Sequence, residues 1–249
     1  MKTLLSVNLN KVALLRNQRN VGYPCPVAAG RTILQAGADG LTVHPRPDER
    51  HIRRADAFDI DKMLEADGHY DRGVEFNIEG NPFDQFMAIC KDIKPQQVTL
   101  VPDDPNAATS DSGWDVFANE ERLRPLISEL KTAGCRVALF MDFDAAPSMQ
   151  KIKEIGADRI ELYTGPYAEE FGGPNQAAMT AQYAKTAIAA SDAGLGINAG
   201  HDLTIENLPA FKQALPNLVE VSIGHAFTSD ALWMGFDETV RAYLKSLGR

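Results

Sequence analysis

Eight short runs of apolar or alternating residues recur along the chain, and this repeat limits the possible folds more than any other feature of the sequence. The runs span residues 4–9, 41–44, 74–79, 98–101, 137–141, 159–163, 195–198 and 219–223. Most are separated by stretches long enough for a helix, among them 26–36, 119–133, 145–155 and 177–193. Strands that alternate with helices in this way predict a parallel sheet with helical crossovers, and therefore an α/β fold.

The side-chain pattern within the runs distinguishes a closed barrel from an open, doubly wound sheet. An open sheet is covered by helices on both faces, so its strands are nearly continuous hydrophobic runs. In the third run, by contrast, Glu75, Asn77 and Glu79 share one face, and Phe76 and Ile78 share the other. The first, second, sixth and eighth runs also alternate. We therefore predict a (β/α)8 TIM barrel with additional short helices, whose interior is polar instead of being filled by branched side chains.

The length of the chain fits this prediction, because 249 residues are typical of one such barrel. We expect a single catalytic domain over residues 1–249. Four glycines, Gly37, Gly134, Gly156 and Gly194, each precede a predicted strand. Glycine can adopt the left-handed conformation that ends a helix, so we interpret these four as folding devices.

Composition argues against several kinds of partner. A net charge of −9 opposes nonspecific binding to nucleic acid, whose phosphates attract basic surfaces. No run of about 18 apolar residues suits a membrane span, and the start of the chain turns polar too early for a secretory leader. Three widely spaced cysteines indicate reduced thiols. We expect a cytoplasmic protein that binds neither membranes nor nucleic acid.

Protonatable side chains gather where the predicted strands end, which is the edge that carries the active site in such barrels. These positions are Asn8, Asn10, His44, Arg46, Glu79, Asp142, Glu161, Thr164, His201 and His225. Histidine changes charge near neutral pH, so three histidines at or after strand ends favour proton transfer. His44 and Glu79 come from neighbouring strands and could meet around one small substrate, although a structural salt bridge is the alternative.

Two features suit a small anion such as a phosphate. The segment HPRPDERHIRR contains His44, Arg46 and His51, and arginine can hold phosphate or carboxylate through two hydrogen bonds. Gly200 and Gly224 follow the seventh and eighth predicted strands, each before an expected helix start. Backbone N–H groups at these places bind phosphate in many barrels.

The segment 102–114 is rich in turn-forming and small polar residues and follows a strand at the catalytic edge. It could close over the site as a lid, with Thr109 as a hydroxyl contact, or it could be a flexible connection.

Common cofactor motifs are absent from the sequence. There is no HExxH or CxxC spacing for a metal, no GxGxxG for a dinucleotide and no GxxxxGK[ST] loop for a nucleoside triphosphate. The sequence therefore disfavours metal, nicotinamide and nucleoside triphosphate chemistry.

Together these segments resemble the pyridoxine 5'-phosphate synthase family of vitamin B6 biosynthesis over essentially the whole chain. The motifs that carry the resemblance are VNLNKVALLRNQR at Val7, AGADGLTVHPRPDERHI at Ala36, FNIEG at Phe76, TLVPD at Thr99, IELYTGPYA at Ile160, INAGHDLT at Ile197 and SIGHA at Ser222. The resemblance implies a transferase that condenses 1-deoxy-D-xylulose 5-phosphate with 3-amino-2-oxopropyl phosphate, giving pyridoxine 5'-phosphate, phosphate and water. It also implies that no metal or organic cofactor takes part, and that the enzyme is a homo-octamer built from dimers.

The resemblance assigns roles by motif position. His44 and Glu79 match general bases, and His201 matches a proton donor. Glu161 matches a residue that stabilises charged intermediates. The residues expected to hold the amine substrate and its phosphate are Asn8, Arg19, Asp202, Gly224 and His225. Those expected to hold the deoxyxylulose phosphate are Asn10, Lys11, Arg46, His51 and Thr109.

Two positions depart from the family pattern. Many relatives have Asp-His where this chain has Asn10 and Lys11, which exchanges an acidic and a titratable contact for an amide and a permanent cation. Some relatives have glycine at the position of Asp202. A carboxylate there opposes a bound phosphate unless it points away or caps a helix.

Two other functions are compatible with the same residues. A phosphosugar aldolase or isomerase on this barrel would use Lys11 to form a Schiff base, and borohydride would then trap a substrate on it. A noncatalytic phosphometabolite-binding protein would bind deoxyxylulose phosphate but release no phosphate when both substrates are present.

Overall fold

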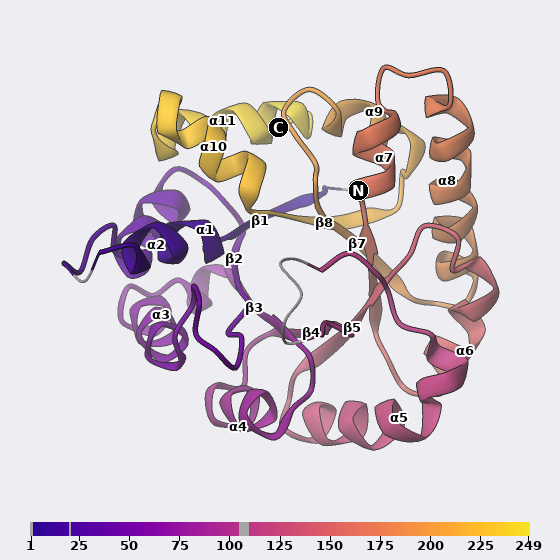
Figure 1. Cartoon of the computed structure of the whole chain (residues 1–249), viewed down its shortest axis with the longest axis horizontal. Helices are drawn as coiled ribbons and strands as arrows, with labels where there is room; N and C mark the ends of the chain where they lie inside the picture. The colour runs from indigo at the N-terminus through magenta and orange to yellow at the C-terminus, as the bar shows by residue number, and fades with distance from the viewer. Residues whose placement is uncertain (1, 20, 105–109) are drawn as a thin grey trace.

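Eight parallel strands close into a barrel in which each strand pairs with its neighbours in sequence and β8 pairs with β1 (Figure 1). The computed structural model describes residues 2–19, 21–104 and 110–249. The strands are β1 (Leu4–Asn8), β2 (Gly40–Val43), β3 (Glu75–Gly80), β4 (Gln97–Leu100), β5 (Arg136–Met141), β6 (Arg159–Tyr163), β7 (Gly196–His201) and β8 (Leu218–Ile223). Each coincides with a predicted run, and the TIM-barrel prediction is confirmed.

Helices lie around the outside of the strands (Figure 1). They are α1 (Asn10–Asn17), α2 (Pro26–Gln35), α3 (Arg54–Ala66), α4 (Asp84–Ile93), α5 (Val116–Thr132), α6 (Met149–Glu154), α7 (Gly165–Glu170), α8 (Gln176–Asp192), α9 (Leu208–Ala214), α10 (His225–Met234) and α11 (Phe236–Ser246), with 3-10 turns η1 (Tyr70–Arg72) and η2 (Ala146–Ser148). The helix predicted at 145–155 is divided into η2 and α6. Among the described helices, none is both long and apolar enough to cross a membrane.

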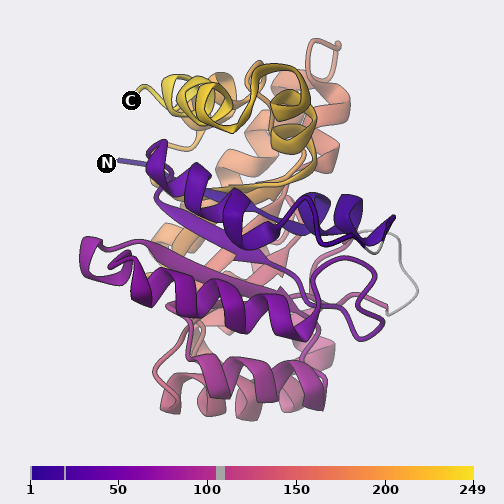
Figure 2. The ribbon, with the colours of Figure 1, turned by 90° about the vertical axis from the view of Figure 1, so that its left-hand side faces the viewer.

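The two ends of the barrel have different tasks. Both chain termini lie at the end where the strands begin (Figure 2), and the Arg249 guanidinium binds the Asp39 carboxylate there. The opposite end, where the strands finish, carries the loops that hold the predicted site residues.

Glycines in the left-handed backbone conformation lie between helices and the strands that follow them. Gly37, Gly134, Gly156 and Gly194 have φ angles of 110°, 101°, 100° and 73°. Their interpretation as helix-ending folding devices is confirmed.

Strand side chains sort into an apolar outer layer and a polar interior. The outward residues Val7, Val43, Phe76, Ile78 and Val221 are fully buried beneath the helices. The buried polar residues on the strands include Ser6, Thr42, Asn77, Gln97, Thr99, Glu161, Asn198, Glu220 and Ser222. The predicted polar interior is therefore confirmed.

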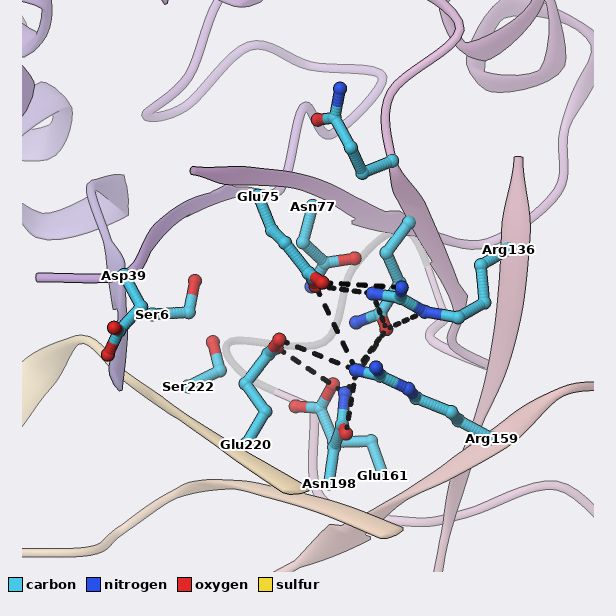
Figure 3. A network of polar contacts seen from close by, with 12 residues as sticks. Ser6, Asp39, Glu75, Asn77, Arg136, Arg159, Glu161, Asn198, Glu220 and Ser222 are labelled. Atoms are coloured by element: carbon cyan, nitrogen blue, oxygen red, sulfur yellow. Dashed lines mark hydrogen bonds and ion pairs between the residues drawn. The ribbon is translucent and has the colours of Figure 1, made fainter. Parts of the chain in front are cut away.

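Charges near the beginning of the strands are arranged in pairs (Figure 3). The Arg136 guanidinium donates to both carboxylate oxygens of Glu75, and Arg159 Nη1 lies 3.6 Å from a Glu220 oxygen. Gln97 Oε1 accepts from Arg136 Nε at 3.1 Å and from Arg159 Nη1 at 3.2 Å. Two cations thus face two carboxyl groups, which offsets part of the cost of removing these groups from water.

Glu220 is the most deeply buried of these carboxyl groups. It accepts a hydrogen bond from Asn198 Nδ2 at 3.3 Å. Burial, and then the negative charge of Glu75, raise the pKa of Glu220 to about 8, although Arg159 opposes the change. This carboxyl group therefore holds its proton at neutral pH.

The chain after β7 differs from the sequence prediction of a short strand followed closely by a helix. β7 continues to His201, and α9 begins only at Leu208. Between them, Thr204 N–H donates to Asn207 Oδ1 at 2.8 Å, and Asn207 N–H donates to Thr204 Oγ1 at 3.1 Å. This reciprocal pair is a capping box that begins the helical turn at Thr204, beyond the end of β7, so Gly200 does not directly precede a helix start. Gly224 does, because α10 begins at the next residue.

Candidate active site

A cavity of about 300 Å³, open to solvent, lies at the end of the barrel where the strands finish. Most of the predicted site residues line it. The lining consists of Asn8, Asn10, Lys11, His44, Arg46, His51, Glu79, Val101, Ser110, Phe140, Glu161, His201, Asp202, Ser222, Gly224 and His225. Residues far apart in the sequence therefore meet in one place, because parallel strands deliver their carboxyl ends to the same edge.

Two residues to which the resemblance assigns roles are not among this lining, and neither are the strand-end residues Asp142 and Thr164. Arg19 lies just beyond α1 and is exposed. Thr109 lies outside the described residues, and so does part of the expected lid at 102–114.

Glu79 lies near the end of β3 and points among amide and hydroxyl groups. Its Oε2 accepts from Asn8 Nδ2 at 3.4 Å, and its Oε1 accepts from Asn77 Nδ2 at 3.3 Å and Ser222 Oγ at 3.5 Å. Burial, and then the nearby Glu161 carboxylate, raise the pKa of Glu79 well above its ordinary value. The group therefore holds its proton to a higher pH than an ordinary glutamate does.

Glu161 is the second buried carboxyl group of the cavity and comes from β6. Thr99 Oγ1 donates to it at 3.3 Å, and burial raises its pKa to about 7. Gly200 on β7 leaves room for it, since a Cβ at that position would lie 2.5 Å from Glu161 Oε1 and 2.9 Å from the Ser222 carbonyl oxygen. The interpretation of Gly200 thus changes from a phosphate contact before a helix to a position where any side chain would crowd the Glu161 carboxyl group.

His44 follows β2 and is almost fully buried. Its backbone N–H donates to Asn10 Oδ1 at 2.9 Å, and its Nε2 lies 3.6 Å from Asp103 Oδ2. Burial, and then the positive charge of Arg46, lower the pKa of His44 well below its ordinary value, so the ring is neutral and can act as a base. Within the described residues, no hydrogen bond or salt bridge joins His44 to Glu79, although both face the same cavity.

Lys11, Arg46 and His51 form a cationic corner of the cavity. The Ile52 N–H donates to His51 Nδ1 at 2.9 Å, so the neutral ring carries its proton on Nε2. Burial, then Arg46 and Lys11, lower the pKa of His51 to about 4. Two permanent cations and one neutral N–H donor suit a phosphate group.

Asp103 is a site residue that the sequence analysis missed. It lies on the loop after β4 and is buried, and its Oδ2 accepts from Arg46 Nη2 at 2.7 Å and Ser110 Oγ at 2.8 Å. It therefore orients the Arg46 guanidinium. The sequence signal was weak, because Asp103 is one acidic residue in a segment that already suggested a turn.

His201 and Asp202 form a contact at the end of β7. His201 Nδ1 lies 2.6 Å from Asp202 Oδ2, and the edge of the His201 ring meets the Tyr163 ring at a centroid distance of 5.2 Å. Asp202 N–H donates to Thr164 Oγ1 at 3.0 Å. The Asp202 side chain thus faces the imidazole.

The start of α10 closes the cavity beside β1. Gly224 lies so near Asn8 that an added Cβ would be 3.1 Å from the Asn8 Cβ. His225 is the first residue of the helix. Backbone N–H groups at a helix start favour an anion, as predicted for this segment.

Buried carboxyl groups, neutral histidines and a cationic corner in one barrel cavity define an enzyme of the (β/α)8 class that can perform acid and base catalysis on small anions. Within the described ranges, no three His, Cys, Asp or Glu side chains are grouped as a metal site requires. That the reaction needs neither metal nor organic cofactor stays a prediction.

The chain belongs to the family described as pyridoxal phosphate biosynthesis protein PdxJ, whose sequence profile matches residues 5–249. Pyridoxine 5'-phosphate synthase from Albidiferax ferrireducens is 51% identical over 254 residues, which cover 100% of this chain and 99% of the relative. The enzyme of that name from Allorhizobium ampelinum is 50% identical over 250 residues, with the same coverage of both chains. The resemblance seen in the sequence is confirmed, and the chain is a biosynthetic enzyme.

Solved structures of other enzymes share the barrel. Phosphoribosylanthranilate isomerase from Thermotoga maritima aligns with a TM-score of 0.59 at 12% identity, over 99% of this chain and 98% of the other. Tryptophan synthase from M. tuberculosis aligns with a TM-score of 0.64 at 12% identity, over 99% of this chain and 91% of the other. Identity this low shows the fold alone.

Proposed function

We propose that this enzyme condenses 1-deoxy-D-xylulose 5-phosphate with 3-amino-2-oxopropyl phosphate to form pyridoxine 5'-phosphate, phosphate and water. The observation that carries the proposal is one cavity in which His44, Glu79, Glu161 and His201 surround a space beside a cationic corner. The whole chain acts as one catalytic domain in this proposal. Family membership and the names of relatives about 50% identical support it.

The deoxyxylulose phosphate binds at the cationic corner. Lys11 and Arg46 supply positive charge, and His51 supplies a neutral N–H donor from Nε2. Asn10 stands beside them, with its side-chain oxygen committed to the His44 backbone. Its Nδ2 group is the part of the side chain that can donate to a substrate hydroxyl.

The phosphate of the amine substrate binds across the cavity. The start of α10 at Gly224 and His225 supplies backbone N–H groups, and Asn8 lies against Gly224. Arg19 and Thr109 remain predicted contacts, since Arg19 is exposed beyond α1 and Thr109 lies outside the described residues.

The chemistry requires repeated proton transfers. Forming a pyridine ring from these substrates involves imine formation, enolisation, loss of phosphate, addition of water and dehydration. His44 is neutral and accepts protons, whereas Glu79, whose pKa is raised by burial, holds its proton more tightly than an ordinary glutamate and can return one after each abstraction. Glu161, with a pKa of about 7, stabilises cationic intermediates once it is ionised, and His201 donates to leaving oxygens.

A two-substrate assay tests the proposal. Purified enzyme is mixed with both compounds, and pyridoxine 5'-phosphate is followed by absorbance while free phosphate is measured in parallel. Both products should appear in equal amounts, and a chelator should leave the rate unchanged. Binding of deoxyxylulose phosphate without phosphate release would overturn the proposal in favour of a noncatalytic binding protein.

The aldolase alternative is tested on Lys11, which lines the cavity. We expect borohydride to trap no substrate on this side chain, because Lys11 serves as an anion contact. A covalent adduct on Lys11, located by mass spectrometry of peptides, would support the aldolase or isomerase instead.

The proposal includes a cytoplasmic homo-octamer built from dimers. Exposed apolar residues on α10, with Leu232 69% and Trp233 89% accessible, support self-association. Eight chains of 27.2 kDa give about 218 kDa, which light scattering after gel filtration measures directly. A mass near one chain or two would contradict the octamer, and recovery outside the cytoplasmic fraction would contradict the location.

A further inference from the structure

His201, the proton donor of the proposed function, contacts the side chain of Asp202. The side chains of His201 and Asp202 are 27% and 37% accessible, and both line the cavity. At 2.6 Å, the distance from Nδ1 to Oδ2 is short enough for a charge-assisted hydrogen bond. The contact therefore lies between two groups that can reach a bound substrate.

The carboxylate determines which imidazole nitrogen carries hydrogen. An ionised carboxylate only accepts hydrogen bonds, so the hydrogen between the two groups belongs to His201 Nδ1. Nε2 then accepts a proton from one substrate group, and the resulting imidazolium, which the carboxylate stabilises, donates it to another. A carboxylate that holds an imidazole in one tautomer performs the same task as the aspartate of a serine protease triad.

The surroundings hold this geometry in place. His201 has a φ of 96°, which is uncommon for a residue with a side chain, and the Tyr163 ring meets the imidazole at an interplanar angle of 83°. The Asp202 backbone is held at both ends, because its N–H donates to Thr164 Oγ1 and its carbonyl oxygen accepts from Asn207 Nδ2 at 3.2 Å. The carboxylate therefore has a defined position from which to orient the ring.

We propose that Asp202 is a positioning residue for His201 and not a phosphate ligand. The proposal rests on the proposed function, in which His201 donates protons. It also removes a difficulty, since a carboxylate at this edge would repel a substrate phosphate if it faced one.

Asp202→Asn tests the proposal, since the amide keeps the size but can present N–H to Nδ1 and favour the wrong tautomer. We expect kcat to fall about 10-fold, with KM for both substrates changed less than about twofold. Asp202→Glu, which restores a carboxylate, should recover part of the loss. Asp144→Asn is the matched control, because it removes the same charge from an exposed position on the loop after β5. A changed KM with unchanged kcat would overturn the proposal and make Asp202 a substrate contact.

Nitrogen-15 NMR of the histidine rings tests the tautomer without substrates. The His201 signals are identified by their loss in His201→Asn. In the wild type, Nδ1 should carry the hydrogen, and in Asp202→Asn a substantial population should carry it on Nε2. The same tautomer in both proteins would overturn the proposal. If the wild type instead formed no product from the two substrates, the proposed function would fail while this measurement would still decide the His201–Asp202 contact.

Discussion

Replacing Glu220 by glutamine should stabilise the protein increasingly as the pH rises. Glu220 lies inside the barrel and is 2% accessible, and its pKa is raised to about 8. Below pH 8 the folded protein keeps this carboxyl group protonated, so a neutral amide of similar size replaces a neutral group. In the unfolded chain, Glu220 ionises near its ordinary pKa of 4.5.

The size of the effect follows from the two pKa values. The folded state binds the proton more tightly than the unfolded state, so the stability that this group contributes is complete below pH 4.5 and is lost as pH rises toward 8. The loss is about 1.4 kcal/mol per pH unit over that window. The amide of Glu220→Gln does not ionise, so the variant avoids this loss. Its free energy of unfolding should therefore exceed that of the wild type by about 3 kcal/mol at pH 7.

Urea unfolding followed by circular dichroism at about pH 5.5, 6.5 and 7.5 measures this difference. The difference in free energy of unfolding between variant and wild type should grow by about 1.4 kcal/mol for each unit of pH increase. Glu238→Gln in α11 is the control, because Glu238 is exposed and its replacement should leave the pH dependence unchanged. A gap for Glu220→Gln that is constant with pH would refute the reasoning, since it would mean that this carboxyl group ionises alike in both states.

Three further predictions concern the cavity. Glu79→Gln should lower turnover about 10²- to 10⁴-fold while circular dichroism stays native, and near-native turnover would remove Glu79 from the mechanism. Gly200→Ala should lower the free energy of unfolding by about 1 to 3 kcal/mol and reduce kcat, because the new Cβ would lie 2.5 Å from Glu161 Oε1; unchanged melting and kcat would contradict this close fit. In an NMR titration, the His51 ring should stay neutral at pH 6 and protonate near its pKa of about 4, whereas protonation near 6.5 would show that Arg46 and burial do not act on it as described.

Much of the fold followed from side-chain alternation. Glu75, Asn77 and Glu79 alternate with Phe76 and Ile78, and a strand with one polar and one apolar buried face fits a barrel better than an open sheet. Site residues could be predicted for a related reason, since a polar residue at the end of a parallel strand must lie at the common edge.

Contacts between loops could not be predicted in this way. Asp103 meets Arg46 only because the loop after β4 passes beside the loop after β2, and no spacing in the sequence records that approach. The place where the turn before α9 begins depends on the capping box of Thr204 and Asn207, whose reciprocal bonds satisfy the first N–H groups of that turn. Gln97 and Asn198 show a third limit. Both are buried in the barrel interior, but the inward face of a strand can be predicted only where several of its residues alternate.

The hydrogen bond from the His44 backbone to Asn10 Oδ1 ties the first loop of the barrel to the second. Aspartate has the same Oδ1 acceptor at the same place, so an Asn10→Asp variant can form an identical tie. That replacement alters the charge presented to the substrate while the two loops keep their alignment. Asn10→Asp should therefore fold like the wild type, and its kinetic differences would report what residue 10 presents to the substrate.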